Sequence, residues 1–174
     1  MPVLTYEMQE LAGFQIPLSY GEFWVCLEGM MTEQDPVNNR TYCRFRCTYL
    51  FTGEWMRDDN SQWSVSCTNL PTASGTKSDN YIYGRHVIGQ TEGWIEHDAE
   101  GKRDLFASAS ISLPYFGGSG TAETWVTIPT IYKGYVHIND HGTWKNAVPF
   151  VKVDGTWKQA MGYVNDHGTW KMSG

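Results

Sequence analysis

The side chains best suited to chemistry in this sequence are its eight tryptophans, whose rings can stack on the apolar faces of sugars. In shallow polar sites, neighbouring Asp, Asn and main-chain groups supply the hydrogen bonds. Trp55 lies within Gly53-Glu54-Trp55-Met56-Arg57, between a predicted strand and an acidic turn, where we expect it to be exposed. Four others lie in the predicted sandwich: Trp24, Trp63, Trp94 and Trp125. We expect most of the eight to pack in a core.

The remaining three tryptophans belong to a repeated unit, Gly-Thr-Trp-Lys, at 142–145, 155–158 and 168–171, with a period of 13 residues. Each unit predicts a short strand, an X-Gly turn and a second strand. The residue before glycine is His or Asp, types that tolerate the left-handed backbone. A unit this short cannot bury a tryptophan alone. We therefore expect the three units to share a core, either with each other in a three-faced prism or with neighbouring chains.

These patterns define a set of candidate ligand-binding residues, all of them aromatic: Trp55, Trp144, Trp157, Trp170, Tyr135 and Tyr163.

A metal site in the repeats is the less favoured interpretation. His141 and His167 follow Asp in two similar segments, and in a trimer they could gather near an axis and bind a cation such as Zn²⁺. The middle repeat has Val153-Asp154 in place of Asp-His. We favour turn chemistry copied by duplication and expect no metal and no other cofactor.

No catalytic motif is present: the chain lacks Gly-x-Ser-x-Gly, HExxH, a P-loop and GxGxxG after a strand. Asp58-Asp59 and the acidic residues near Asp98 fall in predicted turns, where we expect solvated carboxylates. His97 precedes Asp98, but no Ser or Cys partner is marked. We expect the protein not to be an enzyme.

The cysteines at 26, 43, 47 and 67 form no CxxC pair and no zinc-type spacing with His. Cys43 and Cys47 lie about 13 Å apart on one predicted strand, too far to bridge each other. A bridge from either to Cys26 or Cys67 stays open, but we expect four buried free thiols.

Composition excludes other classes. The chain has 174 residues with net charge −6, the opposite of what a phosphate-tracking nucleic-acid binder carries. No apolar segment approaches 18 residues, so we expect no membrane insertion. The first ten residues have no basic start followed by an apolar stretch, and we expect no Sec-type signal peptide.

The sequence pattern predicts β-strands almost throughout, and these strands must position the residues described above. Thr41–Phe51 and Leu105–Leu113 alternate with period 2, as half-buried strands do. Five more strands are predicted, over Glu22–Leu27, Gln62–Thr68, Tyr81–Ile88, Gly93–His97 and Thr121–Ile128. Turns are predicted at 35–39, 58–60, 74–76 and 117–120, and a hairpin loop at Asp98–Gly101. Helix should be close to absent.

A compositional seam follows Ile128-Pro129-Thr130. The fold predicted is all-β, with an antiparallel β-sandwich over residues 1–130; the resemblance described next implies that this sandwich is immunoglobulin-like. Residues 131–174 are predicted to form a small prism-like module of three β-hairpin repeats.

Two stretches carry a resemblance to a known family. The first is Asn38-Asn39-Arg40-Thr41 with the strand that follows it; Asn39-Arg40-Thr41 is also formally an N-glycosylation sequon. The second runs from Trp94 to Lys102, through the Ala/Ser-rich strand, to Trp125-Val126-Thr127-Ile128-Pro129. Both resemble segments of the immunoglobulin-like domains of siphophage minor tail proteins, from phages of Gram-positive bacteria. Val151–Lys158 is similar to the Val-Lys-Val-x-Gly-x-Trp-Lys units that close many phage tail and receptor-binding proteins.

The resemblance implies a virion protein, assembled in the bacterial cytoplasm, exposed on the released particle and in contact with other virion proteins. It supplies no catalytic residue. We favour a host-recognition module that binds a cell-surface carbohydrate such as a cell-wall polysaccharide, with a homo-oligomer (a trimer is favoured) providing avidity. The alternatives are a purely structural tail or baseplate subunit and a lectin unrelated to phage. The charge of −6 disfavours binding to polyanionic teichoic acid and so favours either an uncharged glycan or the purely structural subunit.

Overall fold

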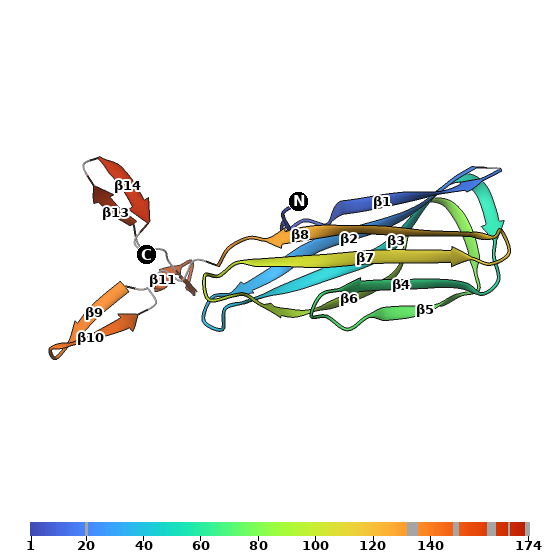
Figure 1. The fold of residues 1–174 in the computed structure, drawn as a ribbon. Coiled ribbons are helices and arrows are strands. Elements are labelled where there is room, and N and C mark those ends of the chain that lie inside the picture. The colour runs from blue at the N-terminus through green and yellow to red at the C-terminus, as the bar shows by residue number, and fades with distance from the viewer. Residues whose placement is uncertain (20, 132–135, 148–149, 160–162, 167, 173–174) are drawn as a thin grey trace.

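The computed structural model describes residues 1–19, 21–131, 136–147, 150–159, 163–166 and 168–172, and for much of the C-terminal region it describes the backbone only. The N-terminal part is an antiparallel β-sandwich (Figure 1). One sheet has the order β1-β2-β3-β6 and the other β5-β4-β7-β8. The bounds are β1 Gln9–Leu18, β2 Gly21–Asp35, β3 Arg40–Arg57, β4 Ser61–Cys67, β5 Ala73–Lys77, β6 Asn80–Glu96, β7 Arg103–Leu113 and β8 Gly118–Ile128.

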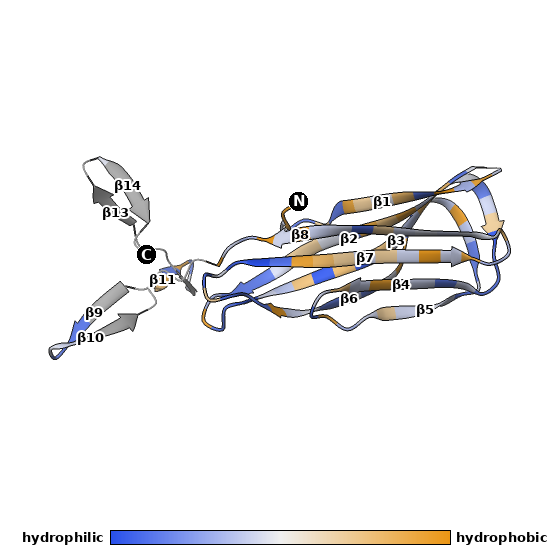
Figure 2. Ribbon diagram, in the orientation of Figure 1, coloured by the Kyte–Doolittle hydropathy of each residue, from blue (hydrophilic) through white to orange (hydrophobic). Residues whose placement is uncertain are grey.

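The core forms because alternate residues of each strand face the opposite sheet, so hydropathy alternates along the ribbon (Figure 2). Phe23, Phe45, Phe51 and Tyr81 supply the aromatic part of the core, and Phe23 stacks on Tyr49 with ring centroids 5.6 Å apart. β7 contributes the small buried residues Ala107 and Ala109 to the core. Burying this apolar surface is the main favourable term in the stability of the sandwich.

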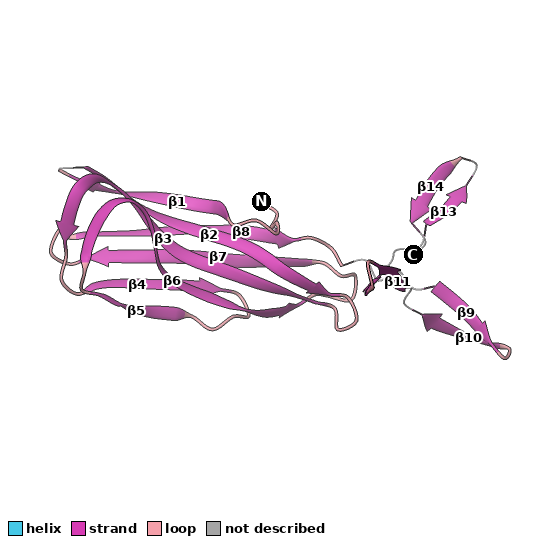
Figure 3. Ribbon diagram, turned by 180° about the vertical axis from the view of Figure 1, so that it is seen from behind, coloured by secondary structure: helices cyan, strands magenta, loops and turns pink. Residues whose placement is uncertain are grey.

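The predicted all-β antiparallel sandwich is confirmed, and within the described part of the chain every regular element is a strand (Figure 3). β1, β2 and β3 follow one another across the first sheet. A constant-type immunoglobulin sheet instead places its second strand beside its fifth. No described helix is long or apolar enough to cross a bilayer.

Four details of the strand prediction were wrong. β1, an edge strand containing Gly13 and Pro17, was missed. The turn predicted at 74–76 is strand β5. The glycine that suggested a turn, Gly75, is there because the Trp63 ring lies against the backbone and leaves no room for a side chain. The two strands predicted over 81–97 form the single strand β6. The loop at 98–101 joins strands of different sheets and is not a hairpin.

The four cysteines are free and buried, as expected from the way free cysteine packs. Burial raises the pKa of the Cys43, Cys47 and Cys67 thiols to about 12, because a thiolate loses its solvation in the core. They pack as small hydrophobic groups between the sheets.

The two segments that carry the phage resemblance meet at one end of the sandwich. Asn39 has a left-handed backbone (φ 55°) and donates from Nδ2 to the carbonyls of His97 (3.1 Å) and Asp98 (2.8 Å). His97 is buried, with Nε2 2.8 Å from the Thr41 hydroxyl and Nδ1 2.8 Å from the Gly101 carbonyl. These residues therefore fasten the β2–β3 turn to the β6–β7 loop.

The chain leaves the sandwich at this same end. Ile131 is buried, and its amide donates to the Gly101 carbonyl at 2.9 Å. A Cβ on Gly101 would lie 2.1 Å from the Ile131 carbonyl oxygen, so only glycine allows this approach. The packed unit therefore includes Ile131, one residue beyond the seam drawn from composition.

The three repeats form three separate antiparallel hairpins: β9 Val136–Asp140 with β10 Thr143–Ala147, β11 Phe150–Val153 with β12 Thr156–Gln159, and β13 Tyr163–Asp166 with β14 Thr169–Met172. The predicted X-Gly turns are confirmed at His141-Gly142 (φ 52° and 86°) and Asp154-Gly155 (φ 49° and 81°). Among the described residues, no strand of one hairpin pairs with another hairpin, so the shared core stays a prediction.

Candidate functional site

β3 ends, and β7 turns into β8, at the end of the sandwich opposite to Ile131 (Figure 1). Residues of these segments line an aromatic hollow. We call it the tip hollow. Its volume is about 420 Å³, and its lining residues are Trp55, Met56, Arg57, Asp59, Tyr115 and Phe116. Trp55 is 63% exposed and Tyr115 79% exposed, so two large rings face solvent in one hollow. The expected exposure of Trp55 is confirmed.

The strand geometry explains why these side chains point outward. β3 bulges between Phe51 and Trp55 and then resumes its pairing with β6, Trp55 opposite Ile82 and Arg57 opposite Asn80. With period-2 alternation, Met56 points into the core, where it is buried, and its two neighbours point to solvent. Ile82 is 49% exposed and extends the apolar surface beside Trp55.

The second wall is held in place by a buried carboxylate. Asp58 is fully buried, and its Oδ2 accepts hydrogen bonds from the backbone N–H of Tyr115 (3.0 Å) and of Phe116 (3.4 Å). Ser61 caps the same turn by donating to the Asp58 carbonyl at 3.1 Å. Asp58 thereby links the β3–β4 turn to the β7–β8 turn and fixes the Tyr115 ring, which packs edge-on against Phe116 at 5.0 Å.

The hollow also carries a charge pair. Arg57 Nε donates to Asp59 Oδ1 at 2.9 Å, and both side chains are more than half exposed. The hydrogen bond from Arg57 to Asp59 raises the pKa of the guanidinium. The lining therefore supplies one cation and one anion beside two rings, and the pair leaves the hollow without net charge. Rings with a few directed polar groups suit an uncharged sugar.

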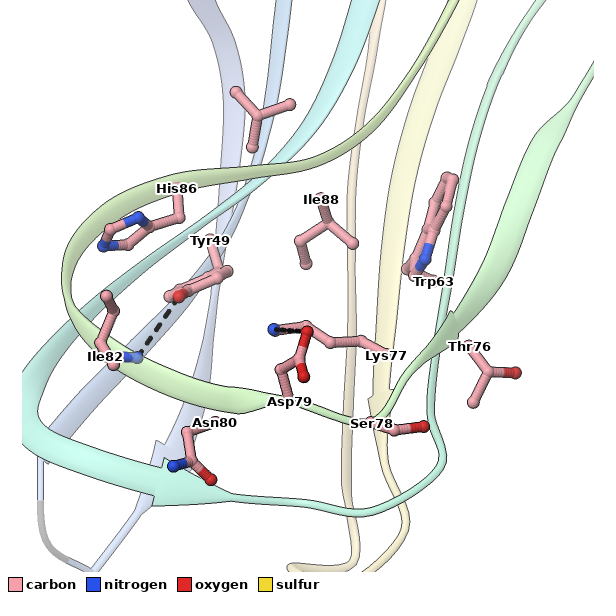
Figure 4. Close-up of a pocket in the computed structure, with 11 residues that line it drawn as sticks. Tyr49, Trp63, Thr76, Lys77, Ser78, Asp79, Asn80, Ile82, His86 and Ile88 are labelled. Carbon is pink, nitrogen blue, oxygen red and sulfur yellow. Dashed lines mark hydrogen bonds and ion pairs between the residues drawn. The ribbon is translucent and has the colours of Figure 1, made fainter.

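A second hollow, of about 450 Å³, opens between the edge strands β5 and β6 (Figure 4). β6 bends at Gly84 (φ 101°), and the hollow lies inside the bend. Tyr49 forms part of its lining and accepts a hydrogen bond at Oη from the Ile82 amide at 3.3 Å. Lys77 faces Asp79 with Nζ and Oδ2 4.0 Å apart. We call it the side hollow, and its lining is mostly polar.

The rings of the side hollow are less available for stacking than those of the tip hollow. Trp63 is half-buried, and the backbones of Gly75 and Gly89 lie directly against its ring. A Cβ on Gly89 would lie 2.1 Å from Cη2 of that ring, and one on Gly75 would lie 3.0 Å from Cζ2. The tip hollow is therefore the better sugar-stacking site.

The other candidate residues lie in the repeats. Trp144, Trp157 and Trp170 pair with Asn139, Lys152 and Asn165 in their hairpins, and Tyr163 begins β13. Their side chains, and Tyr135 entirely, lie outside the described residues. The expectation that most of the eight tryptophans are core residues was wrong, because none of the five in the sandwich is fully buried and Trp125 is 53% exposed.

The aspartate and histidine residues considered for catalysis or metal binding are described next. Asp58 was expected in a solvated turn but is fully buried and structural. His97 is committed to Thr41 and Gly101. His141, considered as a ligand, has a side chain 98% exposed and hydrogen-bonded to Asp140 at 2.6 Å, and His167 lies outside the described residues. Within the described ranges, His, Cys, Asp and Glu form no cluster of three that could hold a metal.

Sequence reasoning missed Tyr115, Phe116 and the role of Asp58. The signal available was the segment Pro114-Tyr115-Phe116-Gly117, two aromatic residues in a turn between strands, where rings are hard to bury. Its proximity to Trp55 depends on a contact between turns about 60 residues apart.

Comparisons of the chain with protein-family models, with characterised proteins and with solved structures give no match.

Proposed function

We propose that this protein binds an uncharged carbohydrate on a bacterial cell surface through the tip hollow, as a host-recognition component of a phage virion. The observation that carries the carbohydrate assignment is the pair of solvent-facing rings, Trp55 and Tyr115, set beside the Arg57–Asp59 pair in one hollow. The two rings would stack on sugar C–H faces, and the charged pair would hydrogen-bond sugar hydroxyls. The virion assignment is supported by the sequence resemblance.

The repeats would then serve assembly. An isolated two-stranded hairpin is at best marginally stable in water. Three such hairpins at the C-terminal side gain a core if several chains combine them, and a trimer would present three tip hollows and raise a weak affinity by avidity. The position of the hollow at the end away from Ile131 keeps it clear of such an assembly.

Binding of the fluorescently labelled full-length protein to a panel of intact Gram-positive cells tests this function. We expect some strains to be labelled and carbohydrate-specific extraction of the wall to abolish the labelling. Trp55→Ala and Tyr115→Ala should each weaken binding by about tenfold or more, since each removes one stacking ring. Tyr83→Ala is the matched control, because Tyr83 is 69% exposed on β6 but does not line the hollow.

Three results would count against the proposal. If no strain is labelled, the purely structural virion subunit becomes the better assignment, and the hairpins are then read as its assembly device. If strains are labelled but Trp55→Ala and Tyr115→Ala bind as well as Tyr83→Ala, the carbohydrate site is elsewhere. Labelling of glycans on many unrelated cell types would favour a lectin outside phage.

A further inference from the structure

The outer face of the β5-β4-β7-β8 sheet is covered with hydroxyl groups arranged in cross-strand rows. The register places Gln62 between Thr76 and Ser112, and Ser112 beside Ser119. The second row has the same character, with Ser64 between Ser74 and Ser110, and Ser110 beside Thr121. The third row pairs Ser66 with Ser108 and ends at the exposed carboxylate of Glu123. We call this set the hydroxyl face: Gln62, Ser64, Ser66, Ser74, Thr76, Ser108, Ser110, Ser112, Ser119 and Thr121.

The opposite sheet shows what an ordinary solvated face of this protein looks like. On its outer side, Arg85 pairs with Glu10 and Glu28, and Arg44 pairs with Glu92. The hydroxyl face has no charged residue in its first two rows, although the whole chain carries −6. Solubility alone therefore does not account for its composition, since the other sheet meets that need with ions.

The hydroxyl groups have hydrogen-bonding capacity to spare. Ser64 and Ser110 bond each other at 2.7 Å, and Ser66 and Ser108 at 2.9 Å. Each hydroxyl has one donor and two acceptor sites, so every such pair keeps one proton and several lone pairs for another molecule. Short Ser and Thr side chains also lose little conformational entropy when a ligand orders them.

The face has both a depression and an aromatic end. A hollow of about 370 Å³ lies over its first two rows. Further along β7, Phe106 pairs with Trp125, whose ring is 53% exposed and packs against Phe106 with centroids 5.6 Å apart. The distance from Phe106 to Ser112 along β7 is about 20 Å, enough for several sugar units.

We infer that the hydroxyl face and Trp125 together form a second binding surface, which takes an uncharged polysaccharide chain laid along β7. Sugar hydroxyls would exchange hydrogen bonds with the serine rows, and one sugar ring would stack on Trp125. A protein partner fits less well, because serine is depleted in protein–protein interfaces and this face offers few apolar anchors. The inference deepens the proposed function, on which it rests, by making the ligand an extended uncharged polymer.

Native gel electrophoresis of the full-length protein through gels that contain an uncharged polysaccharide tests this surface. The probes are dextran, soluble starch, galactomannan and hydroxyethyl cellulose, with polygalacturonate as the charged comparator. Ser110→Lys places a long side chain in the middle of the rows, and Trp125→Ala removes the ring. Thr32→Lys is the matched control, because Thr32 is exposed on β2 of the other sheet and the variant adds the same charge.

We expect at least one uncharged probe to retard the protein and polygalacturonate not to. Ser110→Lys and Trp125→Ala should each weaken the apparent affinity about tenfold, the loss of one or two hydrogen bonds or one stacking contact, and Thr32→Lys should not. Circular dichroism spectra establish that each variant is folded. The inference is overturned if no uncharged probe retards the protein, or if all three variants migrate like the wild type.

The two proposals fail in different ways. If cell labelling is lost with Trp55→Ala and is unaffected by Ser110→Lys and Trp125→Ala, the tip hollow stands and the second surface falls. If polysaccharide retardation is lost with Ser110→Lys and Trp125→Ala while Trp55→Ala changes neither assay, the hydroxyl face stands and the tip hollow falls.

Discussion

Replacing Asp58 with alanine tests whether a buried carboxylate holds the aromatic wall of the tip hollow. In the native protein, the Asp58 carboxylate accepts two backbone hydrogen bonds from the β7–β8 turn, at 3.0 and 3.4 Å. A hydrogen bond to a charged group contributes about 1.5–3 kcal/mol, and the longer one contributes less. Alanine would also leave two N–H donors without an acceptor. We therefore expect Asp58→Ala to lower the free energy of unfolding by about 3 kcal/mol.

Urea denaturation followed by tryptophan fluorescence measures this loss. With a slope of about 1.5 kcal/mol per molar urea, the midpoint should fall by about 2 M. Asp58→Asn keeps one oxygen that can face the two amides, so its midpoint should fall by less than half as much. Asp59→Ala is the matched control: its carboxylate is 55% exposed and pairs only with Arg57 among the described residues, so its midpoint should stay at the wild-type value.

The reasoning is refuted if Asp58→Ala shifts the midpoint no further than Asp59→Ala. Carbohydrate binding gives a second readout, since releasing the turn moves Tyr115 away from Trp55. Asp58→Asn should therefore bind more weakly than the wild type at temperatures where both are fully folded.

Three further predictions concern the core, the exit end and the repeats. Because the pKa of the Cys43 thiol is raised from 9.0 to about 12, pH has no effect through this group below 9. Between pH 9 and 12 the unfolded chain loses a proton that the folded chain keeps, so stability should fall as pH rises. The urea midpoint should therefore be lower at pH 10 than at pH 8, and Cys43→Ala should reduce this difference. An equal difference in the variant and the wild type would contradict the prediction. Asn39→Ala should lower the free energy of unfolding by about 2–3 kcal/mol in the same denaturation assay, because two hydrogen bonds are lost and alanine must adopt a left-handed backbone. Asn39→Gly should lose the hydrogen bonds but avoid the backbone strain, so its loss should be smaller. Trp157→Ala should convert an oligomer to monomer in light scattering while residues 1–131 keep their amide exchange protection. An unchanged mass would show that the repeats do not hold chains together through this tryptophan.

The strands could be predicted where one face is core and the other is water. The alternation over Thr41–Phe51 and Leu105–Leu113 follows from that asymmetry and survives in β3 and β7. The X-Gly turns of the repeats could also be predicted, because φ > 0 is a local requirement. β5 could not be predicted, because Gly75 is required there by the Trp63 ring, which belongs to another strand.

Trp55 could be chosen as a site residue from its local setting, but its partners could not. Tyr115 reaches the hollow through the Asp58 carboxylate, a contact that composition and periodicity do not encode. The same carboxylate looked like one of many solvated turn acids. Too many tryptophans were expected in the core. A tryptophan that faces outward on a strand and is half covered by a neighbour cannot be told from a buried one by sequence. Trp94 is an example, with the Arg40 guanidinium 4.4 Å from its ring centroid.

The tip hollow and the exit of the chain at Ile131 lie at opposite ends of the sandwich, and this arrangement has a mechanical consequence. If the protein were held at its C-terminal side and pulled at the tip, the force would act along the axes of the strands. The hydrogen bonds of a ladder lie across that axis, so β7 and β8 would have to slide past each other and break many bonds at once, whereas a sideways pull would open them one at a time.

The N-terminus reinforces the loaded end. Val3 forms a parallel bridge with Thr127, the Leu4 amide donates to the Thr127 carbonyl and the Thr127 amide donates to the Pro2 carbonyl, each at 2.9 Å. This short clamp holds β8 just before the chain leaves the sandwich. A force applied between the two ends would therefore be carried by the sheet and not by a loop.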